Sequence, residues 1–195
     1  MTRKILMIVG DFTETLEVYV PLFTLRTLGF EVDVCCPNKN KGESVSTAVH
    51  DLSPEYQTYT ERPGHALIMT CNFNEVNPKN YDGLYIPGGR APEYLRTNPN
   101  VVECVKCFVT CGKPIAAMCH GPQLLLATQC MPKRRLTCYP TVMPEVTLAG
   151  GEYVKCPNDE VVVDGNIVTA PTWLACPRLI TEFTTLLGCK PVCTH

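Results

Sequence analysis

The chain has 195 residues, and its 17 Lys and Arg against 19 Asp and Glu give a net charge of −2. At about 150 residues per domain, this length predicts a single domain over residues 1–195, and an apolar content of 45% is sufficient for a buried core. The charge balance argues against nucleic acid and against a membrane surface as partners, because both attract a basic excess. No apolar run has the length of a membrane span or of a signal-peptide core, so we expect a cytoplasmic protein.

Short apolar runs alternate with amphipathic segments along the chain. The apolar runs predict strands at 4–9, 30–36, 66–73, 81–87 and 114–118, and a hairpin at 161–169 around an Asp-Gly turn. The amphipathic segments predict helices at 14–28, 99–110, 122–130 and 177–187. Because Pro21 falls inside the first helix, we expect an irregular first turn there and a regular helix after it. The polar stretch from Asn38 to Gly64 is expected to hold small structures that its sequence does not place.

This alternation predicts an α/β fold in which helices cover both faces of the sheet. In open sheets of this kind, ligands bind beyond the carboxyl ends of the strands. The residues that follow each predicted strand are therefore the candidate site residues.

Thirteen cysteines are an unusual number for a chain of this length. An odd count without a secretory signal argues against a disulfide scaffold. Cys104, Cys107 and Cys111 share one helical face, but no second CxxC or HxxxH completes a tetrahedral set, so we expect no metal ion. We interpret these cysteines, like Cys35 and Cys36, as small apolar side chains on buried faces.

Glu17 follows the first strand and is the only charged residue between Leu16 and Leu25. A carboxyl group among apolar neighbours is costly to bury in its ionised form, so burial would raise its pKa. A glutamate on the exposed face of a helix fits the same pattern equally well.

Paired glycines, Gly88 and Gly89, follow the strand at 81–87. Because they lack side chains, their backbone N–H groups can approach a ligand closely and provide one donor of an oxyanion hole. A plain tight turn explains the pair equally well. The segment has neither the GxGxxG spacing nor the length of a Walker loop, so we expect no nucleotide cofactor.

Cys119 lies between the strand at 114–118 and the helix at 122–130, and it is followed by His120 and Gly121. The small-x-Cys-x-Gly pattern is the cysteine form of the nucleophile elbow, a sharp turn that exposes its central side chain. The N-terminus of the following helix is expected to lower the thiol pKa, and the His120 N–H group is placed as an oxyanion donor. A buried structural cysteine is the alternative.

The four histidines are the candidates for a general base. His50 and His65 lie in the polar stretch and His195 is terminal, and none of them is followed by x-Glu, as a glutaminase-like triad would require. His120 is therefore the well-placed candidate. Because adjacent side chains diverge at a sharp turn, we expect His120 to orient substrate or a neighbouring group rather than to contact the sulfur.

Several segments together resemble the ThiJ/PfpI (DJ-1) superfamily over nearly the whole chain: Gly10-Asp11 with Glu17-Val18, IPGGRAPEYL at 86–95 and GKPIAAMCHGPQ at 112–123. The similarity is greatest to the PfpI-like branch and to one repeat of the plant tandem-domain glyoxalases, through TAVHD at 47–51, QTY at 57–59 and RPGH at 62–65.

The resemblance implies a flavodoxin-like sandwich of the class I glutamine amidotransferase type, with a mostly parallel sheet. It further implies that Cys119 is a nucleophile, that Glu17 is protonated and hydrogen-bonded to the thiolate, and that His120 pairs with Glu93. In PfpI-like members that glutamate comes from a neighbouring subunit, so a homo-oligomer is predicted. One position departs from the plant pattern Trp-x-Gly-His-Pro, because the chain has Cys176 where that histidine stands.

Three hypotheses follow from the resemblance and the residues. The leading one is a cofactor-free enzyme that converts methylglyoxal or glyoxal, or the corresponding glycated adduct, through a hemithioacetal on Cys119, with the Gly89 and His120 N–H groups as oxyanion hole. The second is a cysteine peptidase that uses the same nucleophile, with His120 and Glu93 as general base. The third is a redox-responsive sensor or chaperone in which Cys119 is oxidised without turnover.

Overall fold

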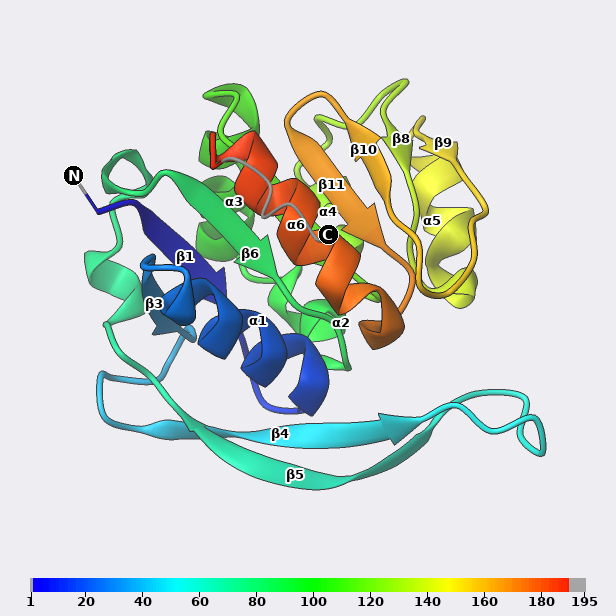
Figure 1. The fold of residues 1–195 in the computed structure, drawn as a ribbon, viewed down its shortest axis with the longest axis horizontal. Coiled ribbons are helices and arrows are strands. Elements are labelled where there is room, and N and C mark those ends of the chain that lie inside the picture. The colour runs from blue at the N-terminus through cyan, green and yellow to red at the C-terminus, as the bar shows by residue number, and fades with distance from the viewer. Residues whose placement is uncertain (1, 190–195) are drawn as a thin grey trace, which may run out of the picture.

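Six strands form the central sheet of the computed structural model, which describes residues 2–189 (Figure 1). The strands are β1 (Lys4–Ile8), β3 (Glu31–Cys35), β6 (Gly83–Ile86), β7 (Ile115–Met118), β10 (Val162–Asp164) and β11 (Ile167–Ala170). Their order is β10-β11-β7-β6-β1-β3, and β10 pairs antiparallel with β11 whereas the other neighbours pair in parallel. Because the inner strands are buried on both faces, their sequences are continuous apolar runs.

Alternate residues of each strand point to two separate apolar layers. Ile5 and Met7 of β1 face one layer, and Leu6 and Ile8 face the other. Helices α1 (Thr15–Thr27) and α6 (Cys176–Leu186) cover the first layer, and α3 (Pro99–Thr110) and α4 (Pro122–Ala127) cover the second. The predicted α/β fold with helices on both faces is confirmed.

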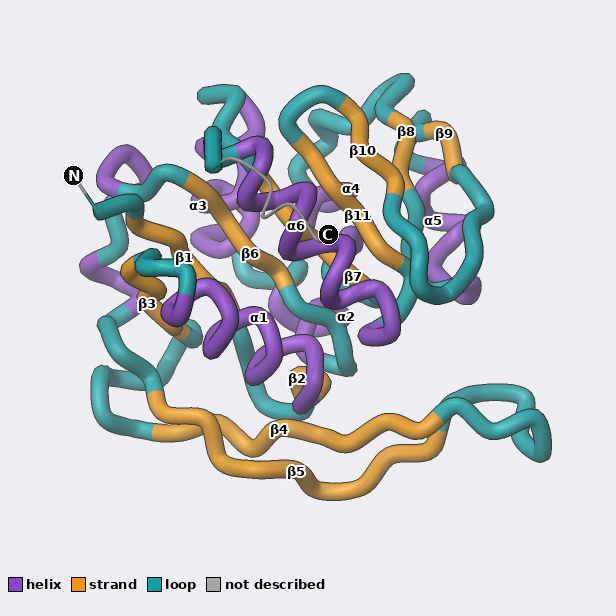
Figure 2. Tube along the Cα trace, in the orientation of Figure 1, coloured by secondary structure: helices purple, strands orange, loops and turns teal. Residues whose placement is uncertain are grey.

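A long hairpin, β4 (Ser44–Asp51) and β5 (Thr60–Ile68), occupies the polar stretch that was predicted to hold unplaced small structures. It joins β2 (Thr13–Glu14) in a second sheet of order β2-β4-β5 (Figure 2). The predicted strand at 66–73 is therefore wrong except at its start. Pro63 and Gly64, which usually interrupt strands, lie inside β5 and hide it from the sequence pattern, and they are tolerated because β5 is an edge strand.

Helix α1 runs without interruption through Pro21, so the expected irregular first turn is wrong. Proline has no N–H group to bond the carbonyl of Glu17, four residues earlier. The Tyr85 hydroxyl donates to that carbonyl instead, at 2.8 Å. The first turn is ordered by Glu14, whose Oε2 accepts the Glu17 N–H at 2.7 Å.

The remaining predicted elements are present with small shifts. The helix at 99–110 has the predicted bounds, and α4 ends at Ala127 rather than at residue 130. Short elements that were not predicted are α2 (Ala91–Leu95), β8 (Arg135–Leu136), α5 (Met143–Leu148) and β9 (Glu152–Tyr153). Among residues 2–189, no helix has the length and apolar character of a membrane span.

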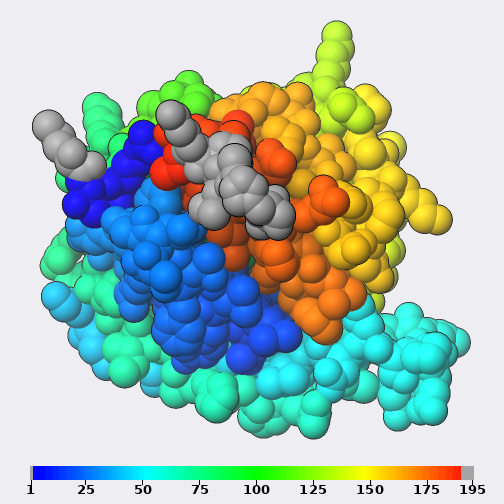
Figure 3. All heavy atoms as spheres, in the orientation of Figure 1, coloured from blue at the N-terminus to red at the C-terminus, as the bar shows by residue number. Residues whose placement is uncertain are grey.

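The hairpin β4–β5 and its connecting loop project beside the main sheet, as the cyan atoms of Figure 3 show. Strand β4 pairs with β2, which bridges to Gly89 just after β6 (Figure 2), and Leu52 and Tyr59 at the two ends of the loop line one pocket with Cys119, just after β7. This arrangement brings the hairpin over the carboxyl ends of the central strands, where the sequence places the candidate site.

Candidate active site

Cys119 occupies a sharp turn between β7 and α4. Its φ of 57° is in the left-handed region, which non-glycine residues rarely adopt, and its backbone is fixed on both sides. The Cys119 N–H donates to the Ala170 carbonyl at 2.8 Å, and the Cys119 carbonyl accepts the Tyr139 N–H at 3.0 Å. The elbow geometry expected from the sequence is therefore present.

Gly88 and Gly89 bring backbone directly against this cysteine. A Cβ atom on Gly88 would lie 2.6 Å from the Cβ of Cys119 and 2.7 Å from Oε2 of Glu17, so no side chain fits there. Gly89 has a φ of 75°, and a Cβ atom on it would lie 2.4 Å from the Glu14 nitrogen. The N–H groups of Gly89 and His120 lie close enough to the Cys119 sulfur to lower its pKa. These are the donors predicted for the oxyanion hole.

Glu17 is fully buried in the first turn of α1. Its Oε2 accepts the Gly88 N–H at 2.6 Å, and its carboxyl group is within hydrogen-bonding reach of Cys119. Burial raises the pKa of Glu17 well above its ordinary value, and neighbouring Glu14 raises it further. Burial thus favours the protonated form of Glu17, in which the carboxyl group has a proton to donate to the sulfur; that Glu17 is protonated stays a prediction.

Opposing effects act on the Cys119 thiol. Burial raises its pKa, and the Glu17 carboxyl raises it further, whereas the N–H groups of Gly89 and His120 lower it. The net direction is upward, so the lowering expected from the helix N-terminus is wrong for the free site. Helix α4 spans only 6 residues, and its dipole is correspondingly too weak to offset burial. Formation of a thiolate therefore depends on a nearby base and on the donors around the sulfur.

His120 is that base by position. Its Nδ1 lies 3.3 Å from the Cys119 sulfur, so the expectation that the two side chains diverge is wrong. Burial lowers the pKa of His120 to about 4, which leaves the imidazole neutral and able to accept a proton. Glu93 of the same chain lies on α2, half-exposed, with Oε1 4.0 Å from Nε2 of His120. A contribution of Glu93 across a subunit interface stays a prediction.

Two further polar groups line the same pocket: Glu14, which was not singled out from the sequence, and His50, which was considered there as a general base and set aside. Glu14 is 1% exposed and lies next to Glu17 in the same pocket. His50 on β4 is also buried, and its Nε2 lies 3.1 Å from Oε2 of Glu61, which in turn is bound by Arg90. The alternation of buried and exposed residues along β4 was the available signal for His50. Its position in a polar stretch obscured that signal.

Aromatic rings close the site above His120. Tyr139 stacks on the His120 ring with centroids 5.2 Å apart, and Tyr59 meets the same ring edge-on at 5.8 Å. Tyr59 comes from the loop that joins β4 to β5. The hairpin therefore contributes both an aromatic cover and the His50 side chain to the site.

These groups enclose one small cavity, which we call the elbow pocket. It holds about 280 Å³ of space including its mouth, and it is lined by Glu14, Glu17, His50, Leu52, Tyr59, Cys119, His120, Tyr139, Thr172 and Trp173. The room inside it for a water-sized molecule is about that of one water, so only a small molecule could enter. The structure thus brings together Cys119, Glu17, His120 and the N–H group of Gly89, with Glu93 at the edge of the group.

Other sequence candidates lie outside this pocket. Cys176 is buried behind it, where its thiol contacts the Leu16 carbonyl and the Met118 sulfur, each at 3.9 Å. His65 is exposed beside Tyr19, and His195 lies outside the described residues. Within residues 2–189, no His, Cys, Asp and Glu side chains gather in threes as a metal site would need.

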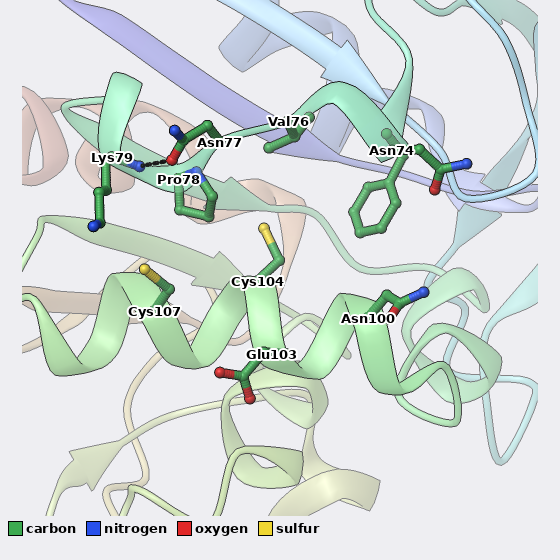
Figure 4. Close-up of a pocket in the computed structure, with 10 residues that line it drawn as sticks. Asn74, Val76, Asn77, Pro78, Lys79, Asn100, Glu103, Cys104 and Cys107 are labelled. Atoms are coloured by element: carbon green, nitrogen blue, oxygen red, sulfur yellow. Dashed lines mark hydrogen bonds between the residues drawn. The ribbon is translucent and has the colours of Figure 1, made fainter.

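A larger hollow lies between α3 and residues 73–79, and we call it the α3 groove (Figure 4). It holds about 970 Å³ of space including its open side. Cys104 and Cys107 project from α3 into it, below Val76 and Pro78. Cys104 is buried, Cys107 is half-buried and Cys111 is exposed, so the interpretation of all three as buried apolar filler holds only for Cys104.

Comparison with known proteins identifies the family of this site. The DJ-1/PfpI family model matches residues 3–186. The chain belongs to the DJ-1/PfpI family. Protein DJ-1 homolog D of Arabidopsis thaliana is 43% identical over 187 residues, which cover 95% of this chain and 48% of that protein. The chain therefore spans about half the length of this plant DJ-1/PfpI relative.

Single-domain relatives are similar over most of their length. A deglycase of Pyrococcus horikoshii is 34% identical over 167 residues, which cover 86% of this chain and 89% of the archaeal protein. The solved structure of Schizosaccharomyces pombe DJ-1 aligns with a TM-score of 0.78 at 21% identity, over 96% of this chain and 93% of that one. The predicted flavodoxin-like α/β fold is thereby confirmed.

Proposed function

We propose that this DJ-1/PfpI chain is a cofactor-free enzyme that converts methylglyoxal or glyoxal to a 2-hydroxy acid through a hemithioacetal on Cys119. One observation carries the proposal. The Cys119 sulfur lies against neutral His120, protonated Glu17 and the N–H groups of Gly89 and His120, inside a pocket sized for a small molecule. A nucleophile, a proton acceptor and an oxyanion hole therefore meet at one point.

The first step forms a carbon–sulfur bond. Nδ1 of His120 takes the thiol proton as the sulfur attacks the aldehyde carbon of the dicarbonyl. The aldehyde oxygen becomes an oxyanion held by the two N–H groups, and the His120 imidazolium then passes the thiol proton to it, which gives the hydroxyl of a hemithioacetal. Burial favours proton transfer at the moment of attack, because no free thiolate then has to persist in the apolar pocket.

The second step is an internal redox exchange that needs no external oxidant or reductant. The hydrogen on the former aldehyde carbon leaves as a proton, and a proton is added to the neighbouring carbonyl carbon, with Glu17 and His120 assisting. The aldehyde carbon is thereby oxidised to a thioester and the ketone carbon is reduced to an alcohol. Water then cleaves the thioester, which releases lactate from methylglyoxal and restores the thiol.

The pocket favours small dicarbonyls over peptides. Its narrow space, covered by Tyr59 and Tyr139, leaves no extended groove for residues on either side of a scissile amide. This counts against the cysteine-peptidase hypothesis. Relatives named as deglycases support a second class of substrate for the same site. This class would be an adduct of methylglyoxal with a small thiol or amine.

The test is a proton-NMR time course with methylglyoxal, without glutathione and with excess chelator. Wild-type protein should form lactate, and Cys119→Ala should form at least about a thousandfold less, because the covalent intermediate is lost. Cys104→Ala removes a buried thiol of the α3 groove and serves as the matched control with wild-type rates. Lactate formation by Cys119→Ala would overturn the mechanism, and loss of aldehyde without lactate would show mere trapping by thiols.

A further inference from the structure

We infer that Glu14 is the acid–base residue that moves the carbon-bound proton during the hemithioacetal-to-thioester step. The inference rests on the function proposed above and assigns one of its steps to a residue. Glu14 ends β2, forms the N-cap of α1 and lines the elbow pocket beside Glu17 and Cys119.

The hydrogen bonding of Glu14 leaves one oxygen free for a ligand. Oε2 accepts the Glu17 N–H at 2.7 Å, whereas Oε1 is buried without a hydrogen-bond partner among the described residues, as is Oε1 of Glu17, which carries its own proton. An unpartnered carboxyl oxygen in a 1% exposed side chain is costly, since the group has lost water without gaining a replacement. Such an oxygen, lining a cavity that also contains the nucleophile, is in position to meet a bound substrate.

Three other acid–base groups of the pocket are already engaged, and one of them is His50, whose Nε2 lies 3.1 Å from Oε2 of Glu61. Glu17 holds its own proton and is anchored to the Gly88 N–H, so it can donate but not abstract. His120 contacts the sulfur through Nδ1 and carries the thiol proton after attack. A further group is therefore needed to remove a proton from carbon, and Glu14 is the remaining carboxyl of the pocket.

The electrostatic setting of Glu14 suits a base that works at neutral pH. Burial raises its pKa to about 7, against the backbone N–H groups of Glu17 and Leu16, which lower it. Titratable groups face it from every surrounding element: Glu17 on α1, His50 and Asp51 on β4, Tyr59 before β5, Tyr85 on β6, Cys119 and His120 at the elbow, Tyr139 after β8 and Cys176 on α6. Because the two neighbouring carboxyls differ in proton affinity, Glu17 can stay protonated and act as an acid while Glu14 ionises and acts as a base.

The proton balance of the step is closed within the pocket. The Glu14 carboxylate takes the proton from the carbon bonded to sulfur, and the electron pair of that C–H bond forms the carbon–carbon double bond. The former ketone oxygen takes a proton from the Glu17 carboxylic acid at the same time, which gives an enediol. The Glu14 carboxylic acid then returns its proton to the adjacent carbon, while the hydroxyl on the sulfur-bearing carbon gives its proton back to Glu17 and becomes the thioester carbonyl. Sulfur, carbon and oxygen connectivity is unchanged, and one carbon is oxidised as its neighbour is reduced.

The test compares wild type with Glu14→Gln, which keeps an oxygen acceptor for the Glu17 N–H but cannot ionise. With methylglyoxal, we expect at least about a hundredfold loss of kcat in lactate formation, with KM within about threefold. Intact mass should still show one methylglyoxal adduct at Cys119, released unchanged on dilution. Below about pH 7 wild-type kcat should fall as Glu14 is protonated, and the residual activity of Glu14→Gln should lack this fall.

Controls separate the possible failures. Glu103→Gln in the α3 groove, an exposed glutamate away from the pocket, should behave as wild type. Glu14→Asp keeps the carboxylate, so it should retain the pH dependence at a lower rate, and it replaces Glu14→Gln if that variant does not fold. Wild-type activity with an unaffected Glu14→Gln overturns this inference alone. Absence of lactate from wild type overturns the proposed function itself.

Discussion

The elbow pocket and the α3 groove both contain cysteines, but their surroundings differ in almost every physical respect. The groove is more than three times larger, about 970 against 280 Å³, and it opens to solvent along one side. Its polar groups do not converge on either sulfur. In the elbow pocket, two carboxyls and two imidazoles line the space beside a single thiol, and two N–H groups lie near its sulfur.

The difference teaches that convergence, rather than volume, marks the reactive site. Cys104 has a pKa raised to about 12 by burial, and only another thiol, Cys107, adds to that effect. Burial also raises the pKa of Cys119, but there a neutral histidine can take the proton and hydrogen-bond donors can hold the charge. Burial therefore disfavours ionisation of both thiols. Of the two, Cys119 has a neighbouring group that can accept its proton.

The largest effect is expected from Gly88→Ala. The added methyl group would press on Cys119 and Glu17 at 2.6 and 2.7 Å, and neither can move away, because both are fixed within the core. We expect lactate formation to fall by about a thousandfold or more, since displacement of the nucleophile by a fraction of an ångström disrupts the oxyanion hole. Steady-state kinetics with methylglyoxal measures the loss.

The control is Gly112→Ala at the end of α3. Gly112 has a φ of 65° but no atom within 4 Å of an added Cβ, so this variant should lose about 1 kcal/mol of stability through backbone strain and no activity. Wild-type turnover in a folded Gly88→Ala protein would show that the close contact around the sulfur is not needed. That outcome would remove the main distinction between the pocket and the groove.

The second prediction concerns stability and pH. The folded-state pKa of Glu14 is about 7 against an ordinary 4.5, so the folded protein binds this proton more tightly than the unfolded chain. The contribution of this bound proton to the free energy of unfolding is fully present below pH 4.5 and is lost as the pH rises through 7. Relative to wild type, Glu14→Gln should therefore gain stability between pH 4.5 and 8, by about 3 kcal/mol at most.

Urea unfolding of both proteins across this pH range measures the difference. Glu103→Gln, in the open groove, should track wild type at every pH, because its side chain is exposed. A stability difference between Glu14→Gln and wild type that does not change with pH would mean that burial does not raise the pKa of Glu14. Ionising a carboxyl group in the elbow pocket would then cost no more than ionising one in the groove.

The sequence predicted the parts of this site that are contiguous along the chain. The elbow at Cys119, the glycine pair and Glu17 each follow a predicted strand, and parallel strands bring such segments to one edge. The order of apolar runs also predicted the central sheet, because strands buried on both faces have a strong continuous pattern. The strands of the two smaller sheets escaped, because β2, β8 and β9 have two residues each, β4 lies in a polar segment and β5 contains Pro63 and Gly64.

What could not be predicted depends on contacts between distant segments. His50 and Tyr59 enter the site because β4 and β5 pair across it, and polar composition gave no sign of that pairing. The contact between His120 and the sulfur depends on rotamers at a strained turn. The pKa of Cys119 depends on full burial, which a helix-terminus argument does not include. Each is a property of packing rather than of local pattern.

The smallest predicted effect tests how the pocket side of α1 accommodates Pro21. The Tyr85 hydroxyl donates to the Glu17 carbonyl that the proline leaves without a helical partner. Tyr85→Phe should therefore destabilise the protein by about 1 to 2 kcal/mol, the cost of one buried unsatisfied carbonyl. Pro21→Ala supplies a new N–H group to the same carbonyl, so Tyr85→Phe should cost less stability in that background, as a double-mutant cycle of urea unfolding measures.

Equal costs of Tyr85→Phe in both backgrounds would show that the hydroxyl does not replace the missing helical bond. The continuity of α1, which holds Glu14 and Glu17 in place, would then have to come from its packing and its remaining hydrogen bonds.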